Sequence, residues 1–149
     1  MIMMSEKISN KNRILLGSIL VIYIVVVLYI TIFSRESDER GLILIPFWEL
    51  QKLLDTKRKM HWFLQIFLNI IMFVPLGVLC PALCRLFRSF IGMTLTALLC
   101  SVAIEAAQYL TARGLAEFDD VMHNTIGAII GFIIFKVLRN NIPILMNNQ

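Results

Sequence analysis

The sequence predicts an all-α integral membrane protein: a bundle of four transmembrane helices with a short interfacial helix between the first and the second. Hydrophobic residues make up 58% of the 149 residues and charged residues only 16%, whereas soluble domains average about 45–50% and about 25%. The mean hydropathy is +0.79. Four apolar runs, residues 14–33, 63–84, 90–110 and 121–138, each approach the ~20 residues that a spanning helix needs.

The first run is interpreted as a retained signal-anchor. Its apolar core of about twenty residues is longer than the 7–15 of a usual signal peptide, and no small-x-small cleavage site precedes Ser34. We therefore divide the chain into a cytoplasmic N-terminal segment, residues 1–13, a transmembrane domain, residues 14–138, and a C-terminal tail, residues 139–149.

The loop after the first run contains LILIPFWELQKLLD, which predicts a short helix at the membrane interface, with a partly re-entrant segment as the alternative. Pro46 suits the start of such a helix because its missing N–H would have no partner there. Phe47 and three leucines would form the apolar face, with Glu49 and other polar residues opposite. Trp48 is of a type that settles at the headgroup level.

The distribution of basic residues predicts a multi-pass protein of the cell membrane with both termini in the cytoplasm. With four spans, three basic segments share one side, which the positive-inside rule makes cytoplasmic. Their residues are Lys7, Lys11, Arg13, Arg85, Arg88, Lys136 and Arg139. The first loop disagrees, since it carries Lys57, Arg58 and Lys59, but it also contains several acids. The net charge of +4 is scattered without a nucleic-acid motif, so no nucleic-acid partner is expected.

Polar side chains concentrate near one end of the second, third and fourth runs. Ionisable groups at membrane depth cost roughly 2.5–3.5 kcal/mol each on insertion scales, so a cluster there requires a reason. Because neighbouring spans run antiparallel, these groups share one leaflet and are expected to line one extracytoplasmic pocket. They are Asn69, Glu105, Gln108, Arg113, Asp119, Asp120, His123 and Asn124.

Small residues and a proline on the same helical faces predict close packing around this pocket. Gly127 and Gly131 form a GxxxG element of the kind that brings membrane helices together. Gly77 follows Asn69 on one face of the second run. Pro75 removes a backbone hydrogen bond within that helix, leaving a carbonyl for a neighbour to satisfy.

The roles of Glu105 and Arg113 stay open on the sequence alone. Glu105 fits a general base, a proton carrier or a cation ligand, or a structural group bound to Arg113, or to Asn69 and Gln108. Arg113 fits a clamp on a phosphate through its bidentate fork, or a counter-charge to the nearby carboxylates.

Asp119 and Asp120 allow three interpretations. One of them would cap the N-terminus of the fourth helix. With Glu105 or Glu117 they would hold a divalent cation, Mg²⁺ or Ca²⁺, as a cofactor. As a catalytic pair they would need unequal pKa values. His123, at helical spacing from Asp120, is expected to be a hydrogen-bonded partner rather than a ligand.

Several fragments also occur in an order and spacing typical of one family. They are LILIPF, NIIMFVPLG, EAAQ and RGLAEFDDVMHNTIGAIIG. With them the chain resembles, over about residues 42–138, the VanZ-like family of bacterial membrane proteins associated with resistance to the glycopeptide teicoplanin. The resemblance implies a role in the cell envelope and in antibiotic resistance.

Two functions follow as hypotheses. The favoured one is a binding or protective protein whose pocket engages membrane lipids or a lipid-linked cell-wall precursor, and so reduces susceptibility to glycopeptides. The alternative is a membrane enzyme acting on a lipid phosphate or acyl group, with Glu105 as base and a metal held by Asp119 and Asp120. A transporter subunit is a weaker idea, since no repeat or pair of broken helices is evident.

Overall fold

The computed structural model describes residues 10–34, 40–55 and 57–141. Most of the expected N-terminal segment and of the tail lies outside the described residues, as do Lys7, Glu36, Asp38 and Glu39. The elements run in the order α1 (Asn10–Leu28), the π-helical turn η1 (Tyr29–Phe33), β1 (Arg40–Ile43), α2 (Trp48–Asp55), α3 (Lys59–Leu83), the 3-10 turn η2 (Arg85–Arg88), α4 (Phe90–Thr111), β2 (Gly114–Glu117) and α5 (Phe118–Asn141).

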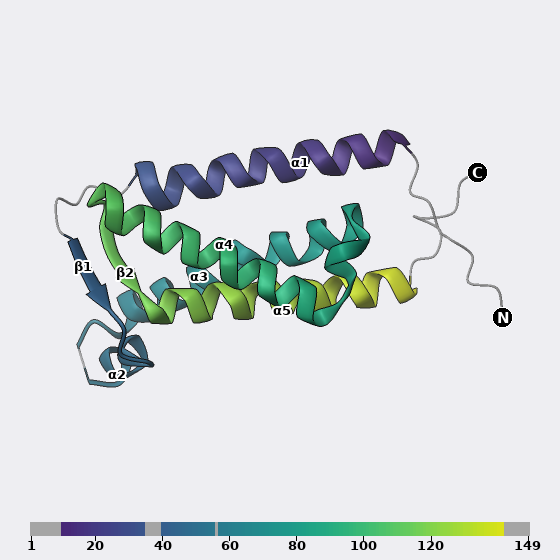
Figure 1. Cartoon of the computed structure of the whole chain (residues 1–149). Coiled ribbons are helices and arrows are strands. Elements are labelled where there is room, and N and C mark those ends of the chain that lie inside the picture. The colour runs from purple at the N-terminus through teal and green to yellow at the C-terminus, as the bar shows by residue number, and fades with distance from the viewer. Residues whose placement is uncertain (1–9, 35–39, 56, 142–149) are drawn as a thin grey trace.

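The predicted bundle of four membrane-spanning helices is confirmed. Helix α1 with η1, and helices α3, α4 and α5, are each long and apolar enough to cross a membrane. Three of them start slightly earlier than expected, at residues 10, 59 and 118 rather than 14, 63 and 121. The short helix between the first and second spans is also present, as α2. Figure 1 shows α2 at one end of the bundle.

Glycines allow α3 and α5 to pack with their backbones in close contact. A Cβ atom at Gly127 would overlap the carbonyl of Ile70, and one at Gly131 would overlap the carbonyl of Val74. Gly77 on α3 meets the Ala128 carbonyl in the same way. Since lipid provides no hydrophobic drive between helices, this close approach is what gives the pair its van der Waals contact.

Helix α1 lies along one side of the bundle and is largely exposed, as expected for a helix that faces lipid (Figure 1). Hydrogen bonds attach α1 near its middle and attach η1, which continues it, at the end. The Tyr23 hydroxyl donates to the Met72 carbonyl of α3 at 2.6 Å. At the other end, Gln108 Nε2 of α4 donates to the Thr31 carbonyl at 3.0 Å. The helix is therefore fixed at two depths.

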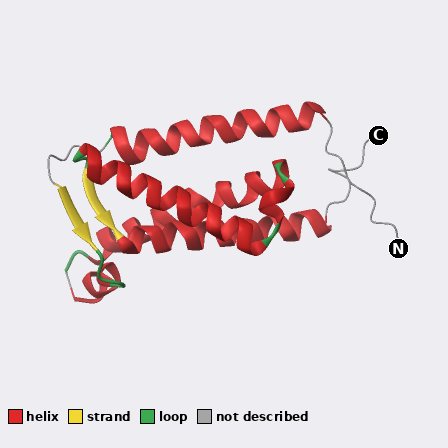
Figure 2. Cartoon of the chain, viewed as in Figure 1, coloured by secondary structure: helices red, strands yellow, loops and turns green. Residues whose placement is uncertain are grey.

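A two-stranded parallel sheet, which the sequence analysis did not predict, joins the first loop to the last (Figure 2). Strands β1 and β2 pair from Arg40 with Gly114 to Ile43 with Glu117. The sheet satisfies backbone groups of both loops and places α2 over the start of α5. The polar end of the bundle is therefore a built structure rather than two independent loops.

The apolar face of α2 is oriented as expected, but Glu49 on its polar face is not. Leu50 and Leu54 are exposed on the apolar face, as a helix in contact with lipid requires. Glu49, expected on the opposite polar face toward water, is instead 0% exposed. The other polar residues of this face, Gln51, Lys52 and Asp55, are exposed as expected. Glu49 differs because it lies in the first turn of α2, where Gln65 of α3 donates a hydrogen bond to it.

The α3–α5 contact makes the first testable prediction. We expect Gly127→Ala to lower the stability of the protein by about 1–3 kcal/mol, because the added methyl group forces two backbones apart. Thermal unfolding in detergent measures the change.

Gly17→Ala is the matched control, since a Cβ atom at Gly17 meets nothing within 4 Å. Equal melting temperatures for the two variants would contradict the close packing of α3 on α5.

Candidate functional site

Five buried carboxyl side chains gather at the end of the bundle that carries α2 and the sheet. Each is no more than 6% exposed: Glu49, Glu105, Glu117, Asp119 and Asp120. They come from α2, α4, β2 and α5. Buried carboxyl groups are costly unless donors or opposite charges meet them. The partners of each carboxyl group therefore show which of them hold the fold and which border open space.

Asp119 holds the N-terminus of α2. Its Oδ1 accepts a hydrogen bond from the Phe47 N–H at 2.7 Å, and its Oδ2 accepts one from the Glu49 N–H at 3.0 Å. These N–H groups lie at the start of α2, where an anionic acceptor is favoured. Asp119 thus caps α2, a helix about seventy residues away in the chain. That one of the two aspartates caps α5 itself stays a prediction, now for Asp120.

The turn into α2 is strained. Phe47 has a φ of 60°, a left-handed conformation that a bulky side chain adopts at a cost of about 1–3 kcal/mol. Its N–H is the one that donates to Asp119. The preceding Pro46 is exposed. The turn sends the chain from β1 across the end of α5 and directs Glu49 inward.

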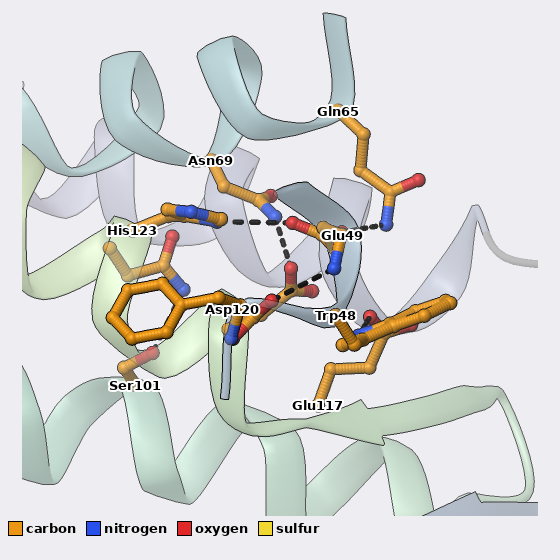
Figure 3. A network of polar contacts seen from close by, with 11 residues as sticks. Trp48, Glu49, Gln65, Asn69, Ser101, Glu117, Asp120 and His123 are labelled. Atoms are coloured by element: carbon orange, nitrogen blue, oxygen red, sulfur yellow. Dashed lines mark hydrogen bonds and ion pairs between the residues drawn. The ribbon is translucent and has the colours of Figure 1, made fainter. Parts of the chain in front are cut away.

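Glu49, Asp120 and His123 form one group at the centre of this end (Figure 3). Glu49 Oε2 lies 3.1 Å from His123 Nδ1. Amides of α3 bind the same carboxylates: Gln65 Nε2 donates to Glu49 Oε1 at 2.5 Å, and Asn69 Nδ2 donates to Asp120 Oδ1. One ligand atom of each of the three residues lies within 4.8 Å of the others.

Glu105 and Glu117 form a second pair beside this group. The Glu117 N–H donates to Glu105 Oε2 at 2.9 Å, and Trp48 Nε1 donates to Glu117 Oε2 at 3.0 Å. Burial is the main reason why the pKa of Glu117 rises from 4.5 to about 8, and the nearby Asp120 and Glu49 carboxylates add to it. The Trp48 hydrogen bond lowers the pKa only in part. Glu117 is therefore largely protonated at neutral pH.

Two cavities flank β2, and Glu117 lines both. One, of about 500 Å³, is walled by apolar residues of β1, α4 and α5, with Glu105 and Glu117 at its polar side. The other, of about 600 Å³, lies between η1, α3 and β2 and includes Gln65 and Asn69. Glu105 and Glu117 thus border space for a bound molecule, whereas Glu49 and Asp120 reach the second cavity only through their partners Gln65 and Asn69.

The remaining residues of the predicted pocket make contacts that hold the bundle. Asn124 Nδ2 donates to Ser101 Oγ at 2.8 Å, joining α5 to α4. Gln108 donates a hydrogen bond to the Thr31 carbonyl of η1. Arg113 donates to the carbonyls of Ile32 and Phe33 at 3.4 and 3.2 Å. Of the eight predicted residues, Asn69 and Asp120 share a hydrogen bond and His123 lies close to Asp120, whereas the contacts described for the others reach different partners.

Sequence analysis missed the inward roles of Glu49 and Gln65. Gln65 stands four residues before Asn69, so the two share one face of α3, and this spacing was a signal available in the sequence. Glu49 had no such signal, because its burial depends on where β1 and Asp119 place α2.

Comparison with known families gives one result. A family model described as VanZ/LLP1 matches residues 20–139, which is most of the chain. Neither the comparison with curated proteins nor that with solved structures gives a match.

The anchoring of α2 by Asp119 can be tested directly. Asp119→Ala should release α2 and red-shift the tryptophan emission, because Trp48 lies in that helix. The loss of charge-assisted hydrogen bonds should lower stability by about 1.5–3 kcal/mol. Asp55→Ala, at the exposed end of α2, is the control. An unchanged spectrum for Asp119→Ala would rule out the anchor.

The raised pKa of Glu117 predicts a pH dependence of stability. Between about 4.5 and about 8 the folded protein keeps a proton that the unfolded chain releases, so the unfolding free energy falls as pH rises through this window. Glu117→Gln should remove this contribution and flatten the dependence of melting temperature on pH. A variant curve parallel to the wild-type curve would show that Glu117 is charged in the fold.

Proposed function

Since this chain belongs to the VanZ/LLP1 family and carries four membrane-spanning helices, we propose that it engages a lipid-linked component of the bacterial cell envelope at its polar end. We propose further that this interaction lowers susceptibility to the glycopeptide teicoplanin. The polar end would then face the outside, with both termini in the cytoplasm, as the distribution of basic residues favours.

The observation that carries this proposal is the apolar cavity of about 500 Å³ with two carboxyl groups in its wall. Leu42, Val102 and Phe118 supply surface for an acyl or prenyl chain. Glu105 and Glu117 supply hydrogen-bonding atoms at one side of that apolar surface. A cavity of this composition fits an amphipathic molecule better than an ion or a sugar alone.

The carboxyl groups of the site indicate which chemical groups of a ligand would bind deepest in the cavity. Carboxyl groups suit hydroxyl and amide N–H donors, which lipid-linked wall precursors carry on their sugars and peptides, and repel phosphate. Two arginines lie at the end of the sheet away from Glu117: Arg40 is exposed and pairs with Gly114, which directly follows Arg113. A phosphate of the same ligand would be favoured there.

An enzyme is the second candidate, and one observation favours it. Glu117 is largely protonated at neutral pH, and both Glu117 and Glu105 line the cavity, so a proton donor and a second carboxyl group border the same space. Such a pair fits acid–base chemistry on a lipid headgroup. Turnover of a lipid substrate by the purified protein, abolished by Glu105→Gln, would select this function over binding alone.

The proposed function predicts a phenotype. Expression in a susceptible Gram-positive bacterium should raise the inhibitory concentration of teicoplanin several-fold, and Glu105→Gln should remove the increase because it replaces a carboxyl group in the cavity wall. Broth dilution measures both.

Asp55→Asn, on the exposed end of α2, is the matched control and should keep the increase. Membrane levels of all variants are compared by immunoblot. An unchanged inhibitory concentration with well-expressed wild-type protein would refute the role in teicoplanin susceptibility.

A further inference from the structure

Three side chains capable of binding a metal ion converge at the polar end from two helices. Glu49 comes from α2, and Asp120 and His123 come from successive turns of one face of α5 (Figure 3). Their ligand atoms all lie within 4.8 Å of one another. Glu49 is 0% exposed, Asp120 is 2% exposed, and the side chain of His123 is 13% exposed. The group is thus enclosed rather than a patch of surface acids.

Two of these atoms contact each other. Glu49 Oε2 and His123 Nδ1 lie 3.1 Å apart, at ion-pair distance, and among the described residues neither buried atom has any other hydrogen-bond partner. A buried carboxylate oxygen can accept more than one contact, so this oxygen has room for a further one. Two ligands bound to one ion at about 2.0–2.2 Å are separated by roughly 3 Å, so this spacing suits donors that share a cation.

The other side of each carboxylate is held in the way that metal ligands are commonly held. Gln65 Nε2 donates to Glu49 Oε1, and Asn69 Nδ2 donates to Asp120 Oδ1. Such outer hydrogen bonds fix the direction of a ligating carboxylate. Both amides come from α3, so three helices orient the group.

The electrostatics of this end also favour a cation. Three buried carboxyl groups, those of Glu49, Asp119 and Asp120, lie close enough to His123 to act on its charge, and Glu117 lies near Glu49 and Asp120. Protonation removes the negative charge of Glu117, but the carboxyl groups of Glu49 and Asp120 still lie close together. Two negative charges out of water are unfavourable unless a proton or a cation compensates them. A divalent cation compensates both at once.

We propose that Glu49, Asp120 and His123 bind a divalent transition-metal ion, of the Zn²⁺ or Mn²⁺ class. A mixed set of two oxygens and one imidazole nitrogen suits these ions, whereas Ca²⁺ and Mg²⁺ prefer oxygen ligands alone. Three protein ligands leave at least one coordination position for water. Gln65 and Asn69, which hold two of the ligands, also line the 600 Å³ cavity. The inference does not depend on the proposed function.

The test uses the full-length protein in detergent, purified without a polyhistidine tag and treated with a chelator. Zn²⁺, Mn²⁺ and Ca²⁺ are titrated separately while tryptophan fluorescence is recorded. The only two tryptophans, Trp48 and Trp62, are in contact at 5.2 Å between ring centroids, and Trp48 adjoins Glu49. We expect a saturable change with Zn²⁺ or Mn²⁺, little response to Ca²⁺, and one retained ion per chain by mass spectrometry of the metal.

Variants then identify the ligands. His123→Gln and Glu49→Gln should each weaken binding by at least about 10–100-fold. His61→Gln is the matched control, because His61 is the other histidine of the chain and is exposed. It should bind like the wild type. Binding that survives in His123→Gln, or that is lost equally in His61→Gln, would overturn the proposal.

A measurement on the wild-type protein keeps the proposal testable if the variants do not fold. Modification of His123 by diethyl pyrocarbonate is followed by mass spectrometry with and without Zn²⁺. A bound ion should protect His123 and leave His61 reactive. Absence of any saturable ion response, or protection of His123 that is the same without metal, would show a simple Glu49–His123 ion pair and refute the site.

Discussion

Carboxyl groups taken out of water at the end of an apolar bundle impose the constraint on which the rest of this structure depends. Each one needs a donor, and few are available at membrane depth. The chain supplies them from its own backbone and amides: the N-terminus of α2 for Asp119, the Glu117 N–H for Glu105, and Asn69 for Asp120. The sheet and α2 therefore lie beside the buried carboxyl groups, to which their N–H groups donate.

This requirement links parts of the chain that are far apart. Strand β1 and helix α2 belong to the first loop, yet they are fixed to β2 and α5 by parallel pairing and by Asp119. The strain at Phe47 is accepted because the anchored turn directs Glu49 into the bundle. A molecule that binds beside β2 would therefore act on the first and last loops together, since they form one unit.

The polar residues divide by what they contact. Asn124 with Ser101, and Gln108 with Thr31, connect helices and give the bundle its register, which is the ordinary use of amides between membrane helices. The carboxyl groups differ, because several of them line cavities or face one another. Ionisable groups in such positions mark functional sites by default, and the proposals on lipid and metal binding rest on this difference.

Length and composition alone determined the four spans, because a membrane leaves a chain few other ways to satisfy its backbone. The amphipathic pattern after Pro46 predicted the short helix. The fragments around Asn69, Glu105 and Asp120 also indicated the family and the polar end. The partners of these residues were decided only by tertiary structure. Pairing of β1 with β2 and burial of Glu49 join segments about seventy residues apart, and no local periodicity records such contacts. A carboxylate accepts from any donor within reach, so only the packed fold selects which one it meets.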